Sequence, residues 1–248
     1  MAKNVAIFCI PLPLHLRGPN DEWTAIAKRA RVIFYNPENV SDELVENLNY
    51  EDLANQKWNK RVVIRSSNNM YNQSLVASLI KNLGEEATEK WAKKLVGNFA
   101  RKPQGNDRSQ ILAVANGEAD LAVANSYYMG IMLSGSAGQE QLVAAEKVKM
   151  IFPNQKNRGT HINISGAGIL KNAPNKDNAN SFIEFLISKR VQKYMIDKSY
   201  EYSVLEDVAP SPEIAGFGTN FKEDQTSVRS FGELNPNAVK LMDRSGWK

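Results

Sequence analysis

Short apolar runs that alternate with amphipathic helical patterns constrain this chain more than any other feature of its sequence. One run is centred on Val32 to Tyr35 and ends at Asn36-Pro37, because proline disfavours continuation of a strand. A second run lies within Arg61 to Ser67. It is followed by apolar residues at helical spacing up to Gly84, the expected C-terminal stop: Leu75, Val76, Leu79, Ile80 and Leu83. The runs predict two buried strands, the second of which forms half of a βαβ unit with its helix.

The same rhythm continues to the C-terminus. A helix over 84–100 precedes a second one that begins at Asn106 as N-cap and ends near Gly117. Strands are predicted at 121–124, 147–155 and 159–170, and the tail 231–248 is expected to be a loop and a short helix. A long amphipathic segment over 175–198 is expected to turn five side chains inward: Phe182, Ile183, Leu186, Tyr194 and Met195. This order indicates an α/β architecture with mostly parallel strands.

Composition excludes several classes of protein. The 248 residues carry a formal net charge of only +4 with both signs interleaved, which argues against a nucleic-acid partner. The single cysteine, Cys9, rules out an internal disulfide framework and cysteine-rich metal sites. No apolar run approaches the ~20 residues that span a bilayer. The first twenty residues imitate a secretory signal, but two late prolines and the lack of a small-x-small cleavage site favour a short strand or an irregular beginning.

Three tyrosines share one position relative to the predicted strands. Tyr71 opens a helix after the second strand, and Tyr127 and Tyr128 open another after the strand at 121–124. Ligands of doubly wound sheets bind at the carboxyl ends of strands, and a helix N-terminus should lower the pKa of a phenol. Phenolate is a hard anionic donor, and three phenolates neutralise Fe³⁺.

Other interpretations of these residues stay open. Buried tyrosines with a hydrogen-bonded hydroxyl are common in protein cores. The two histidines, His15 and His161, are isolated in the sequence and are expected to be structural and hydrogen-bonded. The sequence contains no Ser-His-Asp arrangement, Walker loop, GxGxxG turn or HExxH helix, so a hydrolase or a nucleotide-binding protein has no support.

Longer motifs carry a resemblance to a known family. They are RARVIFYNPENV, YEDLANQKWNKRVVIRSSNNMYNQSLVASLI, NFARKPQGNDRSQI, GEADLAVANSYYMG, FPNQKNRGTHINISGAG and GELNPNAVKLMDRSGW. From about His15 to the C-terminus the chain resembles the ferric-iron-binding substrate-binding proteins of bacterial ABC transporters. The resemblance implies a type II periplasmic-binding-protein-like fold, in which two α/β lobes joined by two crossover strands close on Fe(III). It places Tyr71, Tyr127 and Tyr128 at metal-ligand positions and Arg31 near the metal, where a guanidinium would offset the negative charge of the phenolates.

The resemblance also implies a division of the chain. Residues 1–35 are expected to hold a remnant of the first lobe and the first crossover strand, and 36–158 the second lobe with its tyrosines. Residues 159–248 should supply the return crossover strand, around 161–165, and C-terminal helices that pack on the first lobe. The first lobe is expected to be incomplete, lacking a further tyrosine and a histidine that contribute to iron binding in the family.

The resemblance implies a function that is not enzymatic. The chain is expected to be an Fe(III)-binding solute receptor, periplasmic, not itself membrane-spanning, and a partner of an ABC transporter permease in the inner membrane. Two alternatives remain. One is a shortened chain that binds no metal and acts at most as an interaction module, and the other is a receptor for an oxyanion or a small organic solute.

Overall fold

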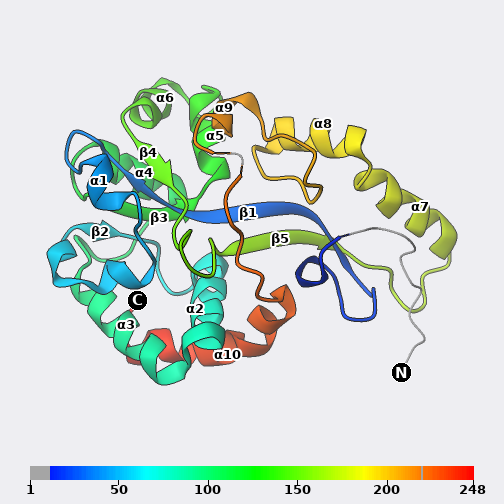
Figure 1. Ribbon diagram of the computed structural model, residues 1–248, viewed down its shortest axis with the longest axis horizontal. Coiled ribbons are helices and arrows are strands. Elements are labelled where there is room, and N and C mark those ends of the chain that lie inside the picture. Colours follow the sequence, from blue (N-terminus) through cyan, green and yellow to red (C-terminus); the bar gives the residue numbers. More distant parts are fainter. Residues whose placement is uncertain (1–11, 219) are drawn as a thin grey trace.

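A long strand at the centre of the molecule organises the fold (Figure 1). The computed structural model describes residues 12–218 and 220–248. The expectations about Cys9 and about the first eleven residues therefore lie outside the described part of the chain. The strands are β1 (Thr24–Tyr35), β2 (Val62–Val63), β3 (Leu121–Asn125), β4 (Lys149–Ile151) and β5 (Ile162–Ala167).

The helices begin and end close to the capping signals of the sequence. Gly84 lies past the end of α2 with φ of 84°, and Asn106 and Ser109 form a capping box at the start of α4. The α-helices are α1 (Asp42–Val45), α2 (Met70–Leu83), α3 (Glu85–Gly97), α4 (Asp107–Ala115), α5 (Tyr127–Leu133), α6 (Gln139–Glu146), α7 (Lys176–Leu186), α8 (Lys189–Ser199), α9 (Pro212–Ala215) and α10 (Val228–Arg244). Short 3-10 turns are η1 (Leu14–Leu16), η2 (Glu51–Ala54) and η3 (Gln56–Trp58).

The strand order is β2-β3-β1-β4, and β5 pairs with the other half of β1. Residues 31–35 of β1 lie between β3 and β4, and residues 24–30 pair with β5, in each case antiparallel. Only β2 and β3 are parallel among the described pairings. The expectation of mostly parallel strands is therefore wrong for this sheet, because an apolar run reveals that a strand is buried but not its direction.

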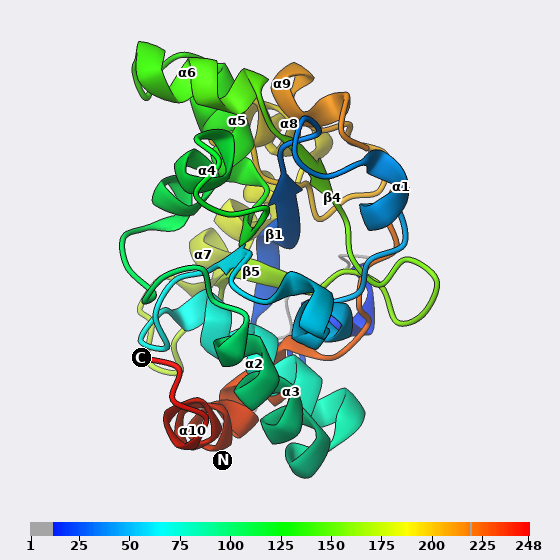
Figure 2. The ribbon, with the colours of Figure 1, turned by 90° about the vertical axis from the view of Figure 1, so that its left-hand side faces the viewer.

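Alternation along β1 divides the core between the two faces of the sheet. Ile33 and Tyr35 pack with α2, α3 and α10, whereas Val32 and Phe34 pack with α4, α5 and α6. Figure 2 shows these two helical groups on opposite sides of β1. Coverage of both faces explains why the strands are continuously apolar rather than alternating.

The C-terminal tail forms one continuous helix, α10, which runs through Pro236. It packs mainly against α2 and α3, and the ring of Trp247 beyond its end lies 6.2 Å from that of Trp91. The expectations of a loop before a short helix, and of C-terminal helices on the first lobe, are therefore wrong for this element. The apolar stripe of α10 buries against the 36–158 segment, and that packing outweighs the helix-breaking tendency of proline.

The amphipathic segment over 175–198 is two helices, α7 and α8, that meet at Ile187-Ser188. Ile183 is buried as expected, but Phe182 and Tyr194 are exposed, so their predicted inward orientation is wrong. Both helices lie beside the end of β1 that pairs with β5, away from α2 and α3 (Figure 1). In the described ranges no helix has the length and apolar character needed to cross a membrane.

Candidate metal centre

The parallel pair β2 and β3 brings the three tyrosines to one edge of the sheet. Tyr71 is the second residue of α2, which follows β2 and is capped by the side chain of Asn69. Tyr127 and Tyr128 are the first two residues of α5, directly after β3 and Ser126. Since neighbouring parallel strands end at the same edge, the two helix starts face each other there, as the sequence predicts.

The three phenols form one group, which we call the phenol cluster. The rings of Tyr127 and Tyr128 lie with their centroids 4.1 Å apart and their planes 31° from each other. Tyr71 lies close enough to Tyr127 to affect its ionisation. All three side chains are partly exposed, so the cluster is open to a solute.

Burial raises the pKa of Tyr127 well above the usual value near 10, and the phenols of Tyr128 and Tyr71 raise it further. The expectation that a helix N-terminus would lower this pKa is therefore wrong. The seven-residue helix α5 is too short to outweigh the cost of ionising a phenol that is half-buried beside two others. A metal ion that binds Tyr127 as phenolate must displace its proton, which makes binding weaker at lower pH.

Arg31 approaches the phenol cluster from β1. Its guanidinium lies 6.0 Å from the centre of the Tyr71 ring and is only 1% exposed. It donates hydrogen bonds to Asp107 at 2.5 Å, to Asn72 at 2.6 Å and to Asn125 at 3.0 Å. Arg31 thus lies beside Tyr71 and is paired with a buried carboxylate, and its place near a metal stays a prediction.

The carboxylate of Asp107 is the counterion of two arginines. It is fully buried at the first position of α4 and accepts from Arg31 through one oxygen and from Arg65, at 2.8 Å, through the other. It also accepts from the backbone N–H of Asn125 at 3.1 Å. A buried ion pair with every oxygen hydrogen-bonded fixes β1, α4 and the end of β3 relative to one another.

A second arginine, Arg29, also belongs to the surroundings of the phenol cluster. Burial opposes its charge, but Glu201 first and then Tyr71 and Tyr127 raise the pKa of its guanidinium. Its Nε donates to Glu201 at 2.5 Å, and its Nη2 donates to Ser165 on β5. Arg29 and Arg31 lie two residues apart on one strand and therefore on the same face.

The charged groups around the phenol cluster leave a positive surplus. Arg29, Arg31 and Arg65 contribute three positive charges, and Asp107 and Glu201 contribute two negative ones. The net +1 of these five groups favours the approach of anionic solutes, whereas burial and the neighbouring phenols keep the pKa of Tyr127 raised. Among the described residues no cluster of three or more His, Cys, Asp and Glu could hold a metal, so phenol oxygens are the candidate donors.

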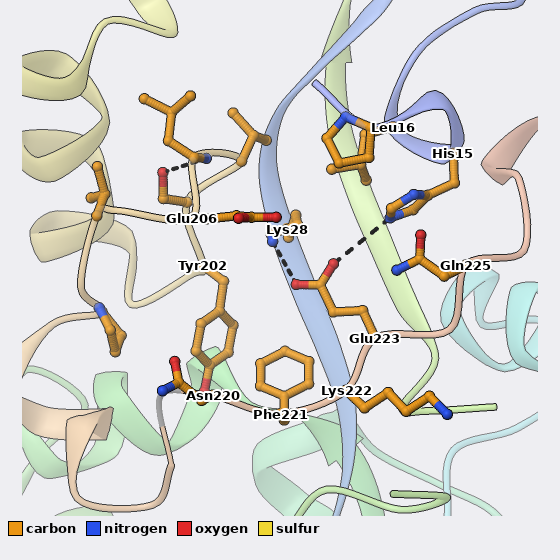
Figure 3. Close-up of a pocket in the computed structure, with 16 residues that line it drawn as sticks. His15, Leu16, Lys28, Tyr202, Glu206, Asn220, Phe221, Lys222, Glu223 and Gln225 are labelled. Atoms are coloured by element: carbon orange, nitrogen blue, oxygen red, sulfur yellow. Dashed lines mark hydrogen bonds and ion pairs between the residues drawn. The ribbon is translucent and has the colours of Figure 1, made fainter. Parts of the chain in front are cut away.

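A cavity of about 490 Å³ lies elsewhere. Lys28 lines it and pairs with Glu223 at 2.5 Å, and His15 lies 3.8 Å from the same carboxylate (Figure 3). Because Lys28 and Arg29 are adjacent on β1, their side chains leave the strand on opposite faces. The cavity and the phenol cluster therefore lie on opposite faces of β1.

The two histidines differ in their hydrogen bonds. His161 is buried and shares a hydrogen bond of 2.7 Å with Ser74, as expected of a structural histidine. His15 is also buried, but at 3.8 Å its Nε2 is beyond hydrogen-bond distance from Glu223 and has no other partner among the described residues. The expected hydrogen bond is thus found for His161 only.

A family model described as bacterial extracellular solute-binding protein matches residues 4–226, most of the chain. The chain belongs to this family. Iron uptake protein A1 of Synechocystis sp. is 51% identical over 237 residues, which cover 96% of this chain and 65% of that relative. The major ferric iron-binding protein of Neisseria meningitidis is 29% identical and is likewise covered to 65%. The chain thus spans less than two thirds of the length of these curated relatives.

Solved structures of this solute-binding family confirm the fold class. The Trichodesmium protein IdiA (FutA), solved in complex with iron and citrate, has a TM-score of 0.91 and 50% identity over 96% of this chain and 74% of its own. The open form of ferric iron-binding protein A from Mannheimia haemolytica has a TM-score of 0.92 at 36% identity over 99% of this chain and 77% of its own. The predicted periplasmic-binding-protein-like type II fold is therefore confirmed as a mixed α/β fold.

Four of the charged residues around the phenol cluster did not emerge from the sequence: Arg29, Arg65, Asp107 and Glu201. The spacing of Arg29 and Arg31 on a predicted strand was the one available signal, because residues two apart on a strand share a face. Asp107 and Glu201 meet their arginines across 76 and 172 residues of sequence. No local sequence pattern predicts contacts between residues so far apart in the chain.

Proposed function

We propose that this chain binds ferric iron through the phenol oxygens of Tyr71, Tyr127 and Tyr128. The observation that carries the proposal is the convergence of three phenols at one sheet edge, with the Arg31 guanidinium 6.0 Å from the ring of Tyr71. Hard anionic oxygens suit Fe³⁺, and three phenolates neutralise it. Water or a small chelator such as citrate completes the coordination in this proposal.

The relatives support an assignment to iron uptake. Their names are iron uptake protein and major ferric iron-binding protein, and the Trichodesmium structure holds iron and citrate. By this proposal the chain is a receptor rather than an enzyme, acts in the periplasm and delivers iron to an inner-membrane ABC permease. Residues 36–158 would be the lobe that carries the ligands, and β1 and β5 the two crossover strands.

Visible absorption tests the proposal directly. Protein stripped with a chelator and titrated with ferric citrate should develop a phenolate-to-iron charge-transfer band. The band should be lost in Tyr127→Phe/Tyr128→Phe. Tyr194→Phe is the matched control, because Tyr194 is an exposed phenol on α8, and it should keep the band.

Each alternative predicts a different result. A chain that binds no metal would give no band with the unaltered sequence, and that result would overturn the proposal. A receptor for oxyanions, which the surplus positive charge favours, would bind citrate without iron, and calorimetry with sodium citrate alone measures that directly. Binding of citrate with equal affinity in the presence and absence of iron would favour the oxyanion receptor.

A further inference from the structure

The three residues that follow α8, Tyr200 to Tyr202, connect that helix to the sheet and to the phenol cluster. The backbones of Tyr202 and Lys28 exchange two hydrogen bonds of 2.8 Å, so the segment lies alongside β1 next to Arg29. The side chain of Gln192 on α8 donates to the carbonyl of Ile26 at 2.9 Å. Hydrogen bonds therefore tie both α8 and the 200–202 segment that follows it to β1.

Glu201 holds the guanidinium that faces the phenols. Its carboxylate accepts from Arg29 Nε at 2.5 Å, with both side chains mostly buried. Arg29 lies two residues before Arg31 on the same face of β1, and the Arg31 guanidinium is 6.0 Å from the ring of Tyr71. Glu201 thus fixes the place of a guanidinium beside the one that contacts the phenol cluster.

Tyr200 contacts the helix that carries two of the phenols. A Cβ atom at Gly130 would lie 2.4 Å from both Cβ and Cγ of Tyr200, so no side chain fits there without movement of one element. Gly130 lies three residues after Tyr127, about one turn along α5. Tyr200 adopts left-handed backbone angles, φ 59° and ψ 19°, which residues with a large side chain rarely adopt.

These contacts reach the phenol cluster from two directions. We propose that Tyr200 and Glu201 are positioning residues of the metal centre: Tyr200 sets the place of α5 through Gly130, and Glu201 sets the place of Arg29. Neither residue touches the metal in this arrangement. The inference rests on the proposed function for its role in iron binding, but the contacts can be tested without iron.

The Arg29–Glu201 half of the inference is tested by ferric citrate binding at one fixed pH. Glu201→Gln removes the acceptor that holds the Arg29 guanidinium and should weaken binding about 10-fold, the loss typical of residues that support metal ligands. Arg29→Lys keeps the charge but not the forked hydrogen bonds to Glu201 and Ser165, and should weaken binding by a similar factor. The double variant should bind no worse than Arg29→Lys alone, because residues that act as a pair are not additive.

Non-additivity distinguishes positioning from a purely structural role. If Glu201 acted independently of Arg29, the losses of the two single variants would add in the double variant, and that outcome overturns this half of the inference. Binding by Glu201→Gln equal to that of the unaltered chain would overturn it as well. Should the unaltered chain give no iron band, the proposed function fails, while urea unfolding of the same four proteins still decides whether Glu201 and Arg29 act as a pair.

The packing half is tested at Gly130. Gly130→Ala should weaken ferric citrate binding between about 10- and 100-fold, the loss typical of residues that support metal ligands. Gly232→Ala is the matched control, because a Cβ at this glycine of α10 meets no atom within 4 Å, and its iron binding should be unchanged. In metal-free protein, Gly130→Ala should also shift the near-ultraviolet circular dichroism of the Tyr127–Tyr128 pair. Affinity and spectrum like those of the unaltered chain would overturn the role of Tyr200.

Discussion

His161 is the residue through which acid should destabilise the protein. Its ring is buried against Phe231, with centroids 4.8 Å apart, and its Nε2 is hydrogen-bonded to Ser74. Burial is the main reason that its pKa falls from 6.5 to about 3, and Arg31 and Arg158 lower it further against the opposing effect of Asp224. The folded state thus keeps this imidazole neutral at a pH where the unfolded chain takes up a proton.

The sign of the pH effect follows from this difference. Between pH 6.5 and about 3 the unfolded chain binds one more proton at His161 than the folded chain, so the free energy of unfolding should fall as pH falls. The expected slope is about 1.4 kcal/mol per pH unit. Urea denaturation between pH 4 and pH 7 measures it, and His161→Gln should flatten the dependence. Equal slopes for the two proteins would contradict the assignment.

At the same scale, the sequence predicted the candidate ligands better than their surroundings. Tyr71, Tyr127 and Tyr128 each follow an apolar run and open a helix, which is a local pattern. The counterions Asp107 and Glu201 are defined by contacts between distant segments. The raised pKa of Tyr127 likewise depends on burial, which the spacing of residues in the sequence does not predict.

Among the elements, α10 invites a direct test, because it contains an exposed proline. Pro236 lacks the N–H that would complete a helical hydrogen bond, and its ring crowds the preceding turn. Pro236→Ala should therefore raise the free energy of unfolding by about 1–3 kcal/mol. Thermal or urea unfolding measures the gain, and Gly232→Ala in the same helix should give about 1 kcal/mol for comparison. A loss of stability in Pro236→Ala would mean that α10 needs the proline to fit α2.

The elements also mark where sequence reasoning was insufficient. The helix boundaries at Gly84 and Asn106 were predictable because caps are local. The directions of the strands and the partner of α10 were not predictable. Apolar periodicity shows that one face of an element is buried, but not which element covers it. The inward orientation of Phe182 failed for the same reason.

For the whole molecule, the apolar side chains on α7 should govern its surface behaviour. Phe182 and Phe185 are 59% and 56% exposed and stack with their centroids 6.3 Å apart. An exposed pair of aromatic rings is a binding site for hydrophobic dyes and a route to self-association. Phe182→Ser/Phe185→Ser should lower anilinonaphthalene sulfonate fluorescence and light scattering at high protein concentration. Val239→Ser, at an exposed residue of α10, should change the dye fluorescence and the scattering little. An equal drop in both variants would contradict the role of the two phenylalanines.

The alternation of side chains along β1 limits how this sequence can vary in length. Lys28 faces the cavity and Arg29 faces the phenols. A shift of the strand by one residue would exchange the faces that the two side chains occupy. An insertion or deletion between Lys28 and Tyr35 would turn the residues on one side of it to the opposite face of the sheet, and either the arginines or the core residues would be misplaced. The irregular pairing between Ala25 and Ala27 already holds an extra residue and is a place where the strand accommodates one. A change in the length of β1 is therefore tolerable only ahead of Lys28.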